Sequence, residues 1–216
     1  MAGKLLTEFI GTFFLVLAIA LAVASGSTLA PLAIGLMLMA MVYAGGHVSG
    51  AHYNPAVTVA VAIRGRCPIT DVVPYWAAQF AGSFAASACA ALATGKAFFA
   101  QPGAGVSPPT ALLVEIVFTF ALAFVVLHVA THRKTAGNSY YGAAIGLTVT
   151  AAAVTAGPVS GCALNPAVGL GTGLHAQLVA GADVPTSVFL IYSAGPIIGA
   201  ALAAIAFKLV SGPDAD

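Results

Sequence analysis

Residues 49–60 read SGAHYNPAVTVA, and they interrupt a chain of 216 residues that is 60% hydrophobic and only 6% charged. The pattern returns at residues 160–171, which read SGCALNPAVGLG. Asn is a favoured helix N-cap and Pro is favoured at the first helical position, so each Asn-Pro-Ala tripeptide predicts a helix start. The predicted helices, 54–64 and 165–175, are too short to span a membrane. At about 1.5 Å per residue, each covers roughly half of a 30 Å hydrocarbon core.

The composition indicates a membrane protein, because soluble domains carry about 25% charged residues. Six apolar stretches are long enough for spanning helices, given that neighbouring segments protect the shorter ones. They are residues 5–24, 31–45, 72–94, 111–130, 140–156 and 185–210. The net charge of +1 argues against a nucleic-acid partner, which would need a basic face.

The basic residues predict the orientation, since Lys and Arg are enriched on the cytoplasmic side. If the six helices alternate in direction, only Lys96 of the seven Lys and Arg residues falls on the second side. We therefore expect a multi-pass protein of the plasma (inner) membrane with both termini in the cytoplasm. The six residues expected on the cytoplasmic side are Lys4, Arg64, Arg66, Arg133, Lys134 and Lys208.

An internal repeat runs through the hydrophobic pattern. Residues 7–18 (TEFIGTFFLVLA) and 114–125 (VEIVFTFALAFV) share a Glu at the second position, Glu8 and Glu115. Each half then holds a second helix, an Asn-Pro-Ala segment and a third helix. Three spans per half place the halves in opposite orientations, an inverted repeat whose broken helices meet near the membrane midplane. We expect one all-α domain over 1–216, with repeats of about 1–96 and about 110–212.

The segments before the tripeptides, 46–53 and 157–164, are expected to cross the rest of the membrane without helical hydrogen bonds. Such backbone is tolerated at membrane depth only when it is buried in protein or lines a wet cavity. The sequence therefore predicts that their carbonyl groups line a pore. The residues concerned are Gly50, Ala51, His52 and Tyr53 in the first half, and Gly161, Cys162, Ala163 and Leu164 in the second.

These features resemble the major intrinsic proteins, the aquaporin and aquaglyceroporin family. The resemblance covers the whole chain and includes the paired motifs, AAQFAGS with Gln79, and GPIIGA at 195–200. It implies six tilted helices and two half-helices around one pore per subunit, usually in a homotetramer. It also implies a passive channel without enzymatic activity, cofactor or metal, whose partners are water, small neutral solutes and the lipid bilayer.

The resemblance assigns roles to individual residues. Asn54 and Asn165 would offer amide donors to a passing solute, and the half-helix N-termini would oppose cations. Glu8 and Glu115 would accept hydrogen bonds from the loop amides and so stabilise the loops. The remaining motif residues are Pro55, Ala56, Pro166 and Ala167.

The second motif departs from the family, because Val168 stands where most members have an Arg. Counting by the family's spacing places Ile34, Ala153 and Cys162 at the other three positions of the selectivity filter. These side chains are uncharged and largely apolar, so we expect a wide filter that passes water, glycerol, urea and metalloid acids such as arsenous acid. Arg-lacking variants resemble certain bacterial channels associated with arsenic resistance. The glycerol-type pattern is incomplete, because Gly169 replaces the usual Asp and the 96–109 loop is short.

Two alternatives remain open at this stage. One is a water-selective channel whose constriction has moved to Tyr53 or Leu164. The other is a coupled transporter or a membrane protein without a pore, although the two intramembrane Glu residues already have a structural explanation. An enzyme is rejected, because no nucleophile–base pair is present. Cys162 is expected to face the pore, where a mercurial could block it.

Overall fold

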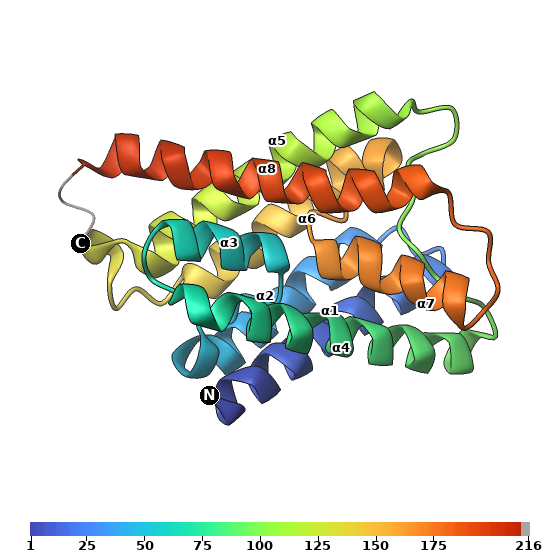
Figure 1. Cartoon of the computed structure of the whole chain (residues 1–216), viewed down its shortest axis with the longest axis horizontal. Helices are drawn as coiled ribbons and strands as arrows, with labels where there is room; N and C mark the ends of the chain where they lie inside the picture. Colours follow the sequence, from blue (N-terminus) through green and yellow to red (C-terminus); the bar gives the residue numbers. More distant parts are fainter. Residues whose placement is uncertain (213–216) are drawn as a thin grey trace.

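The computed structural model describes residues 1–212, which are helical and contain no β-strand. Six of their helices are long and apolar enough to cross a membrane (Figure 1). They are α1 (Ala2–Ala24), α2 (Ala30–Ser49), α4 (Ile69–Thr94), α5 (Pro108–Thr131), α6 (Tyr141–Ser160) and α8 (Thr186–Ser211). The shorter segments are α3 (Pro55–Ile63), η1 (Arg133–Thr135), η2 (Ala167–Gly171) and α7 (Thr172–Leu178).

The two halves repeat the same packing. In the first half α1 packs against α2 and α4, and in the second half α5 packs against α6 and α8. The contact between α2 and α6 joins the two halves. The half-helices cross between the halves, because α3 packs on α8, whereas η2 and α7 pack on α4. This is the all-α inverted repeat that the sequence predicts, with two half-helices enclosed by six spanning helices.

Corresponding glycines allow close helix contacts in each half. A Cβ atom on Gly82 of α4 would lie 2.5 Å from the carbonyl oxygen of Phe9 in α1. A Cβ atom on Gly199 of α8 would lie 2.3 Å from the carbonyl oxygen of Ile116 in α5. Phe9 and Ile116 each follow the Glu of their repeat. Small residues therefore let both helix pairs approach backbone to backbone, as is common between membrane helices.

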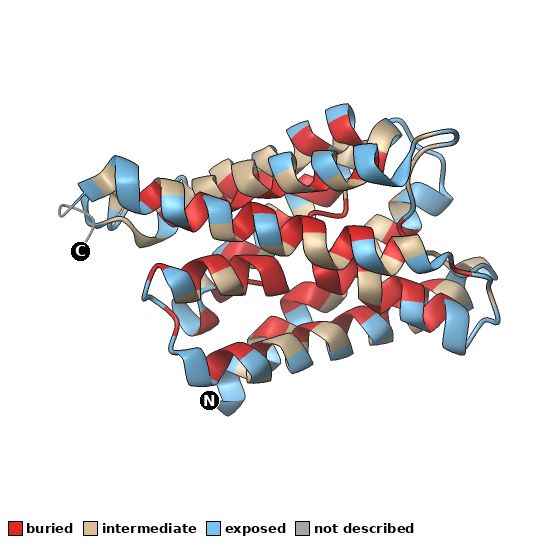
Figure 2. Ribbon diagram, turned by 45° about the horizontal axis from the view of Figure 1, so that its top comes forward, coloured by how far each residue is buried: buried red, intermediate tan, exposed pale blue. Residues whose placement is uncertain are grey.

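Burial follows the same arrangement (Figure 2). Most residues of the half-helices and the inward faces of the spanning helices are buried, whereas the outward faces expose large apolar side chains such as Leu92, Leu147 and Ile205. An apolar outer surface around a buried, partly polar interior fits an integral membrane protein, because lipid rather than water covers the exposed side chains.

The unwound segments are shorter than the sequence predicts. The expectation that helical bonding stops at Gly46 and Gly157 is wrong, because α2 continues to Ser49 and α6 to Ser160. Each helix ends at a left-handed glycine, Gly50 (φ 88°) or Gly161 (φ 80°). Glycine adopts this conformation without a Cβ penalty and is the common way to end a helix. Within the predicted segments 46–53 and 157–164, only residues 50–53 and 161–164 lack helical structure.

The two half-helices differ in their first turns. The first is α-helical from Pro55, whereas the second begins with the wider π-helical turn η2 before α7 extends to Leu178. Gly169 lies within this turn, and a Cβ atom there would come 2.1 Å from Cβ of Tyr192. The π-turn therefore lies where the half-helix touches α8. Single π-turns of this kind are frequent at functional sites.

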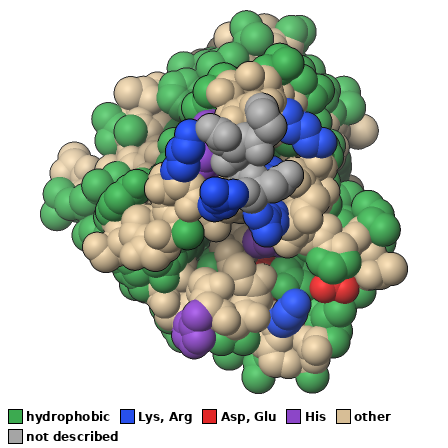
Figure 3. All heavy atoms as spheres, turned by 90° about the vertical axis from the view of Figure 1, so that its left-hand side faces the viewer, with side chains coloured by type: hydrophobic (Ala, Val, Ile, Leu, Met, Phe, Trp, Pro, Cys, Tyr) green, Lys and Arg blue, Asp and Glu red, His purple; other side chains and the backbone are tan. Residues whose placement is uncertain are grey.

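Both described chain ends lie on one side of the bundle, at the left of Figure 1. We call this the termini side and the opposite side the far side. Figure 3 views the termini side and shows Lys and Arg side chains gathered on it. The helix ends and loops on this side carry Lys4, Arg64, Arg66, Arg133, Lys134 and Lys208.

Candidate functional site: a cavity between two half-helices

Asn54 and Asn165 cap the two half-helices in the same way. Oδ1 of Asn54 accepts a hydrogen bond from the backbone N–H of Ala56 at 2.8 Å, and Oδ1 of Asn165 accepts one from Ala167 at 2.9 Å. The sequence explains this geometry, because an Asn before Pro is a strong N-cap whose carbonyl oxygen binds an otherwise unpaired donor. The caps fix the direction of both amide groups.

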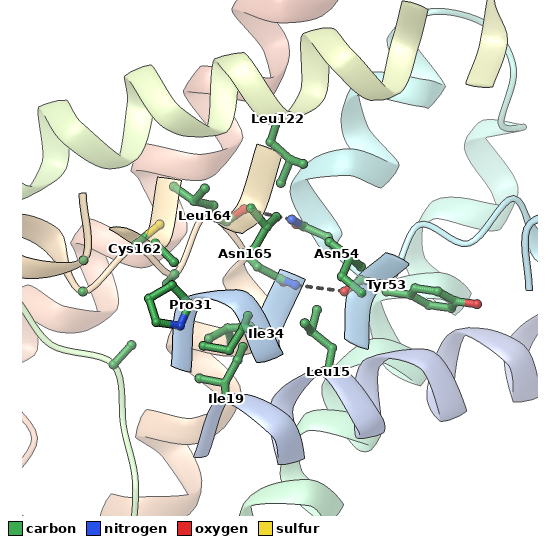
Figure 4. A pocket seen from close by; sticks show the side chains of 18 of the residues that line it. Leu15, Ile19, Pro31, Ile34, Tyr53, Asn54, Leu122, Cys162, Leu164 and Asn165 are labelled. Atoms are coloured by element: carbon green, nitrogen blue, oxygen red, sulfur yellow. Dashed lines mark hydrogen bonds between the residues drawn. The ribbon is translucent and has the colours of Figure 1, made fainter. Parts of the chain in front are cut away.

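The same two residues also join the halves. Nδ2 of Asn54 donates to the carbonyl oxygen of Leu164 at 2.8 Å, and Nδ2 of Asn165 donates to that of Tyr53 at 2.9 Å. Each asparagine therefore bonds to the residue directly before the other. Figure 4 shows the two amide groups close together at the centre of the cavity. Because an amide NH₂ has two donors, each asparagine retains a second N–H.

Glu8 holds the first unwound segment from α1. Its Oε1 accepts hydrogen bonds from Oγ of Ser49 (2.7 Å) and N–H of His52 (2.9 Å). Its Oε2 accepts them from N–H of Tyr53 (2.7 Å) and Nε2 of Gln79 (2.8 Å). The carboxylate is fully buried, so these four donors replace the water that it loses.

Glu115 holds the second segment from α5 in nearly the same way. Its Oε1 accepts from Oγ of Ser160 (2.7 Å) and N–H of Ala163 (3.0 Å), and its Oε2 accepts from N–H of Leu164 (2.7 Å). No fourth donor is found among the described residues, because Pro196 occupies the position in α8 that corresponds to Gln79 in α4. Both halves therefore share the hydrogen bonds between the loop and the carboxylate, whereas the glutamine donor occurs only in the first half.

The polar cluster of the first half extends to Thr58. Nε2 of Gln79 also donates to Oγ1 of Thr58 at 3.1 Å, and Nδ1 of His52 lies 3.1 Å from the same oxygen. In the second half the corresponding residues are Gly169 and Ala163, which have no polar side chain. The cavity thus has more polar surroundings beside the first half-helix than beside the second.

Corresponding residues of the two unwound segments adopt positive φ angles. Besides the glycines, they are Ala51 (52°) and Tyr53 (50°) in the first half, and Cys162 (50°) and Leu164 (49°) in the second. Non-glycine residues rarely adopt this conformation, and the strain persists only where surrounding contacts hold it. Here the N–H groups of Tyr53 and Leu164 donate to the two buried carboxylates. Those of Ala51 and Cys162 donate to the hydroxyl groups of Ser49 and Ser160. The strain lies beside the asparagine pair, on the cavity wall.

A cavity of about 450 Å³ runs past the asparagine pair. Its lining includes the four predicted filter residues Ile34, Ala153, Cys162 and Val168, which the structure brings to one space. It also includes the loop residues Ala51, His52, Tyr53, Gly161, Ala163 and Leu164, but not Gly50. None of the described lining residues is Asp, Glu, Lys or Arg.

The apolar side chains of the cavity wall were missed by the sequence analysis. Leu15 of α1 and Leu122 of α5 approach the asparagine pair from opposite sides (Figure 4). Each lies the same distance along the chain after the Glu of its repeat, so the internal repeat was a signal that could have found them. The other missed apolar wall residues on the helices are Ile19, Val23, Ala30, Pro31, Leu38, Val42, Val57, Val126, Ile145 and Val149.

The loop between α4 and α5 also contributes to the site. Residues 97–101 line the far-side end of the cavity. N–H of Gly103 donates to the carbonyl oxygen of Val159 at 3.0 Å, which fastens the loop to the end of α6. The loop therefore covers the cavity mouth although it contains no helix.

This architecture defines a multi-pass membrane channel protein. Two half-helices meet at their capped N-termini inside a bundle of spanning helices, and a continuous cavity passes their junction. Buried backbone without helical structure is expected at membrane depth only where it lines such a passage.

Residues 1–207 match the family model described as major intrinsic protein, and the chain belongs to this family. Aquaporin NIP1-3 of Oryza sativa subsp. japonica is 42% identical over 99% of this chain and 75% of its own length. Aquaporin AqpM of Methanothermobacter thermautotrophicus is 35% identical over 96% of this chain and 97% of its own. The aquaglyceroporin of Plasmodium falciparum has the same fold, with a TM-score of 0.87 at 22% identity over 98% of this chain and 97% of that one.

Proposed function

We propose that the protein is a passive channel for water and for small uncharged solutes, including glycerol, urea and metalloid acids such as arsenous acid. Aquaporins of this family are passive channels and not enzymes, which supports the general activity. The observation that carries the solute range is the uncharged cavity lining, with Val168 at the position where most members place an Arg.

The asparagine pair is the proposed site at which a passing solute forms hydrogen bonds with the protein. Oδ1 and one N–H of each side chain are held by protein, so the remaining N–H can bind a solute oxygen. The backbone carbonyls of the unwound segments supply acceptors beside it. A neutral hydroxylated solute can therefore exchange its water hydrogen bonds for protein ones as it passes.

Cations meet an opposing field at the same point. The N-terminus of a helix carries about half a positive charge, and the two half-helices direct their N-termini at one place. Glu8 and Glu115 are not among the described residues that line the cavity, and the loop N–H donors offset part of their negative charge. The proposal therefore retains cation exclusion without the filter Arg.

The second candidate is a water-selective channel whose constriction lies near Leu164. Leu164 lines the cavity beside the asparagine pair and is 2% exposed. Tyr53 does not fit this role, since its ring points away from the cavity (Figure 4) and its hydroxyl donates to the carbonyl oxygen of Met41 at 2.9 Å. This candidate predicts fast water flux and negligible glycerol flux.

The setting of the channel is also part of the proposal. The gathered Lys and Arg residues support a cytoplasmic location for the termini side, in the plasma membrane. The resemblance supports a homotetramer with one pore per subunit. The proposed channel domain spans 1–216, with repeats of about 1–96 and about 110–212, and its last four residues lie outside the described part of the chain.

Stopped-flow light scattering on proteoliposomes tests the proposal. The wild type should pass water, glycerol, urea and arsenous acid. Val168→Arg should reduce glycerol and arsenous acid flux at least about tenfold, which corresponds to about 1.4 kcal/mol of added barrier. Val168→Met is the control for added bulk without charge and should reduce these fluxes less. Water flux without glycerol flux in the wild type would favour the second candidate.

A further inference from the structure

The internal repeat pairs each residue of the predicted filter with a residue on the termini side. We call Ile34, Ala153, Cys162 and Val168 the far-side ring. The residues at the same positions of the other repeat, relative to Asn54 or Asn165, are Ile145, Val42, Ala51 and Val57, which we call the termini-side ring. All eight residues line the same cavity. Because both motifs here read Asn-Pro-Ala-Val, no charged side chain distinguishes one ring from the other.

The termini-side ring is the more enclosed of the two. Its four residues are all buried, from 3% exposed for Val42 and Val57 to 8% for Ala51. In the far-side ring, Ala153 and Cys162 are only partly buried. Side chains that face an open passage retain exposure, so the passage is wider at the far-side ring.

The extent of the cavity also indicates that the passage is wider at the far-side ring. Beyond the far-side ring it continues along Val23 and Pro31, and residues 97–101 of the loop between α4 and α5 line the same cavity. The residues at the corresponding positions of the second repeat are Ala130 and Gly142, and neither is among the described residues that line the cavity. The described lining of this cavity therefore reaches further beyond the far-side ring than beyond the termini-side ring.

The side chains explain why the termini-side ring is tighter. Val42 carries two methyl groups on its Cβ atom, whereas the side chain of its counterpart Ala153 ends at Cβ. Three of the four residues of the termini-side ring are β-branched. Such side chains have few rotamers, so they move little when a solute passes. The far-side ring has two β-branched members and one flexible thiol, Cys162.

We propose that the termini-side ring, and Val42 in particular, sets the upper size of the solutes that pass. This rests on the proposed function, because it assumes that neutral solutes larger than water enter the cavity. Selection by size then occurs after the solute has passed Val168 and the asparagine pair, for a solute that enters from the far side.

The test measures the ratio of glycerol to urea permeability in proteoliposomes for the full chain. Val42→Ala should raise this ratio several-fold, and Val42→Ile should lower it, whereas the water permeability of both variants shows that they fold. Ala153→Val makes the reverse change in the far-side ring and should alter the ratio less than Val42→Ala does. Val154→Ala, on the outward face of α6 at 58% exposed, should leave the ratio unchanged.

The proposal is overturned if Val42→Ala and Val42→Ile leave the ratio unchanged, or if Ala153→Val changes it more than Val42→Ala. Failure of the proposed function gives a different result, since the wild type would then pass water alone. In that case urea flux through the Val42→Ala variant would still support the termini-side ring as the size limit. If this variant also passed no urea, the proposal would be rejected.

Discussion

Gln79 donates a hydrogen bond from Nε2 to Oε2 of Glu8 over 2.8 Å, deep inside the first half of the bundle. Among the described residues of the second half, none makes the corresponding contact with Glu115, because Pro196 stands in place of the glutamine. Both carboxylates hold an unwound segment by accepting its N–H hydrogen bonds, but only Glu8 also accepts one from a glutamine. The contribution of that extra hydrogen bond to stability can therefore be measured.

Replacing Gln79 by Met removes two hydrogen bonds, one to the carboxylate and one to Thr58. A hydrogen bond to a charged group contributes about 1.5–3 kcal/mol. The loss is partly offset, since Oε1 of Gln79 is a buried acceptor without a partner in the described structure. We expect a net destabilisation of about 1 kcal/mol, seen as a lower thermal midpoint in detergent.

Ser193→Ala is the matched control on α8. Its hydroxyl bonds only to carbonyl oxygens of its own helix, those of Phe189 and Leu190, so the midpoint should hardly move. Equal shifts for the two variants would mean that the Glu8 contact contributes nothing of its own.

Gly199→Ala should be the more damaging change. The added Cβ would lie 2.3 Å from the carbonyl oxygen of Ile116 and 2.9 Å from the backbone nitrogen of Phe120, so α8 and α5 must separate. Overpacking in a well-packed interior costs about 1–3 kcal/mol. Thermal unfolding followed by circular dichroism measures the loss. Gly3→Ala meets nothing within 4 Å and should be neutral or slightly stabilising, and a similar loss there would contradict the packing argument.

Cys162 provides a chemical probe of the passage, because it is a free, partly buried thiol on the cavity wall. Mercuric chloride should suppress water and solute flux in the wild type by filling the far-side ring. Cys162→Ala should remove most of this inhibition. Cys89→Ala, at an exposed position on α4, should remain inhibited, and relief by that variant instead would place the blocking site outside the cavity.

The polar framework of the site could be predicted because its residue types have few roles inside a membrane. Two Asn-Pro-Ala starts and two buried Glu residues leave little choice of arrangement once the halves are recognised as inverted. The extent of α2 and α6 could not be predicted, because Gly46 and Gly157 suggest helix breaks where the structure has none. Their helices end only at the left-handed glycines Gly50 and Gly161.

The apolar wall was harder to predict for a physical reason. Both faces of a spanning helix are hydrophobic, so polarity does not tell whether Val42 faces lipid, a neighbouring helix or the cavity. The π-turn at Gly169 likewise depends on the approach of Tyr192, which is remote in sequence. Such features follow from three-dimensional packing rather than from local pattern.

The reciprocal bonds of Asn54 and Asn165 also constrain biosynthesis. Asn54 binds the carbonyl of Leu164, a residue 110 positions further along the chain. During synthesis, residue 54 reaches the membrane before residue 164 has been made. At that stage the amide donor of Asn54 lacks its partner, the carbonyl oxygen of Leu164. We therefore expect the first half to settle only after the second has been inserted, and a chain truncated between them to be recognised as unfinished by the quality control of the cell.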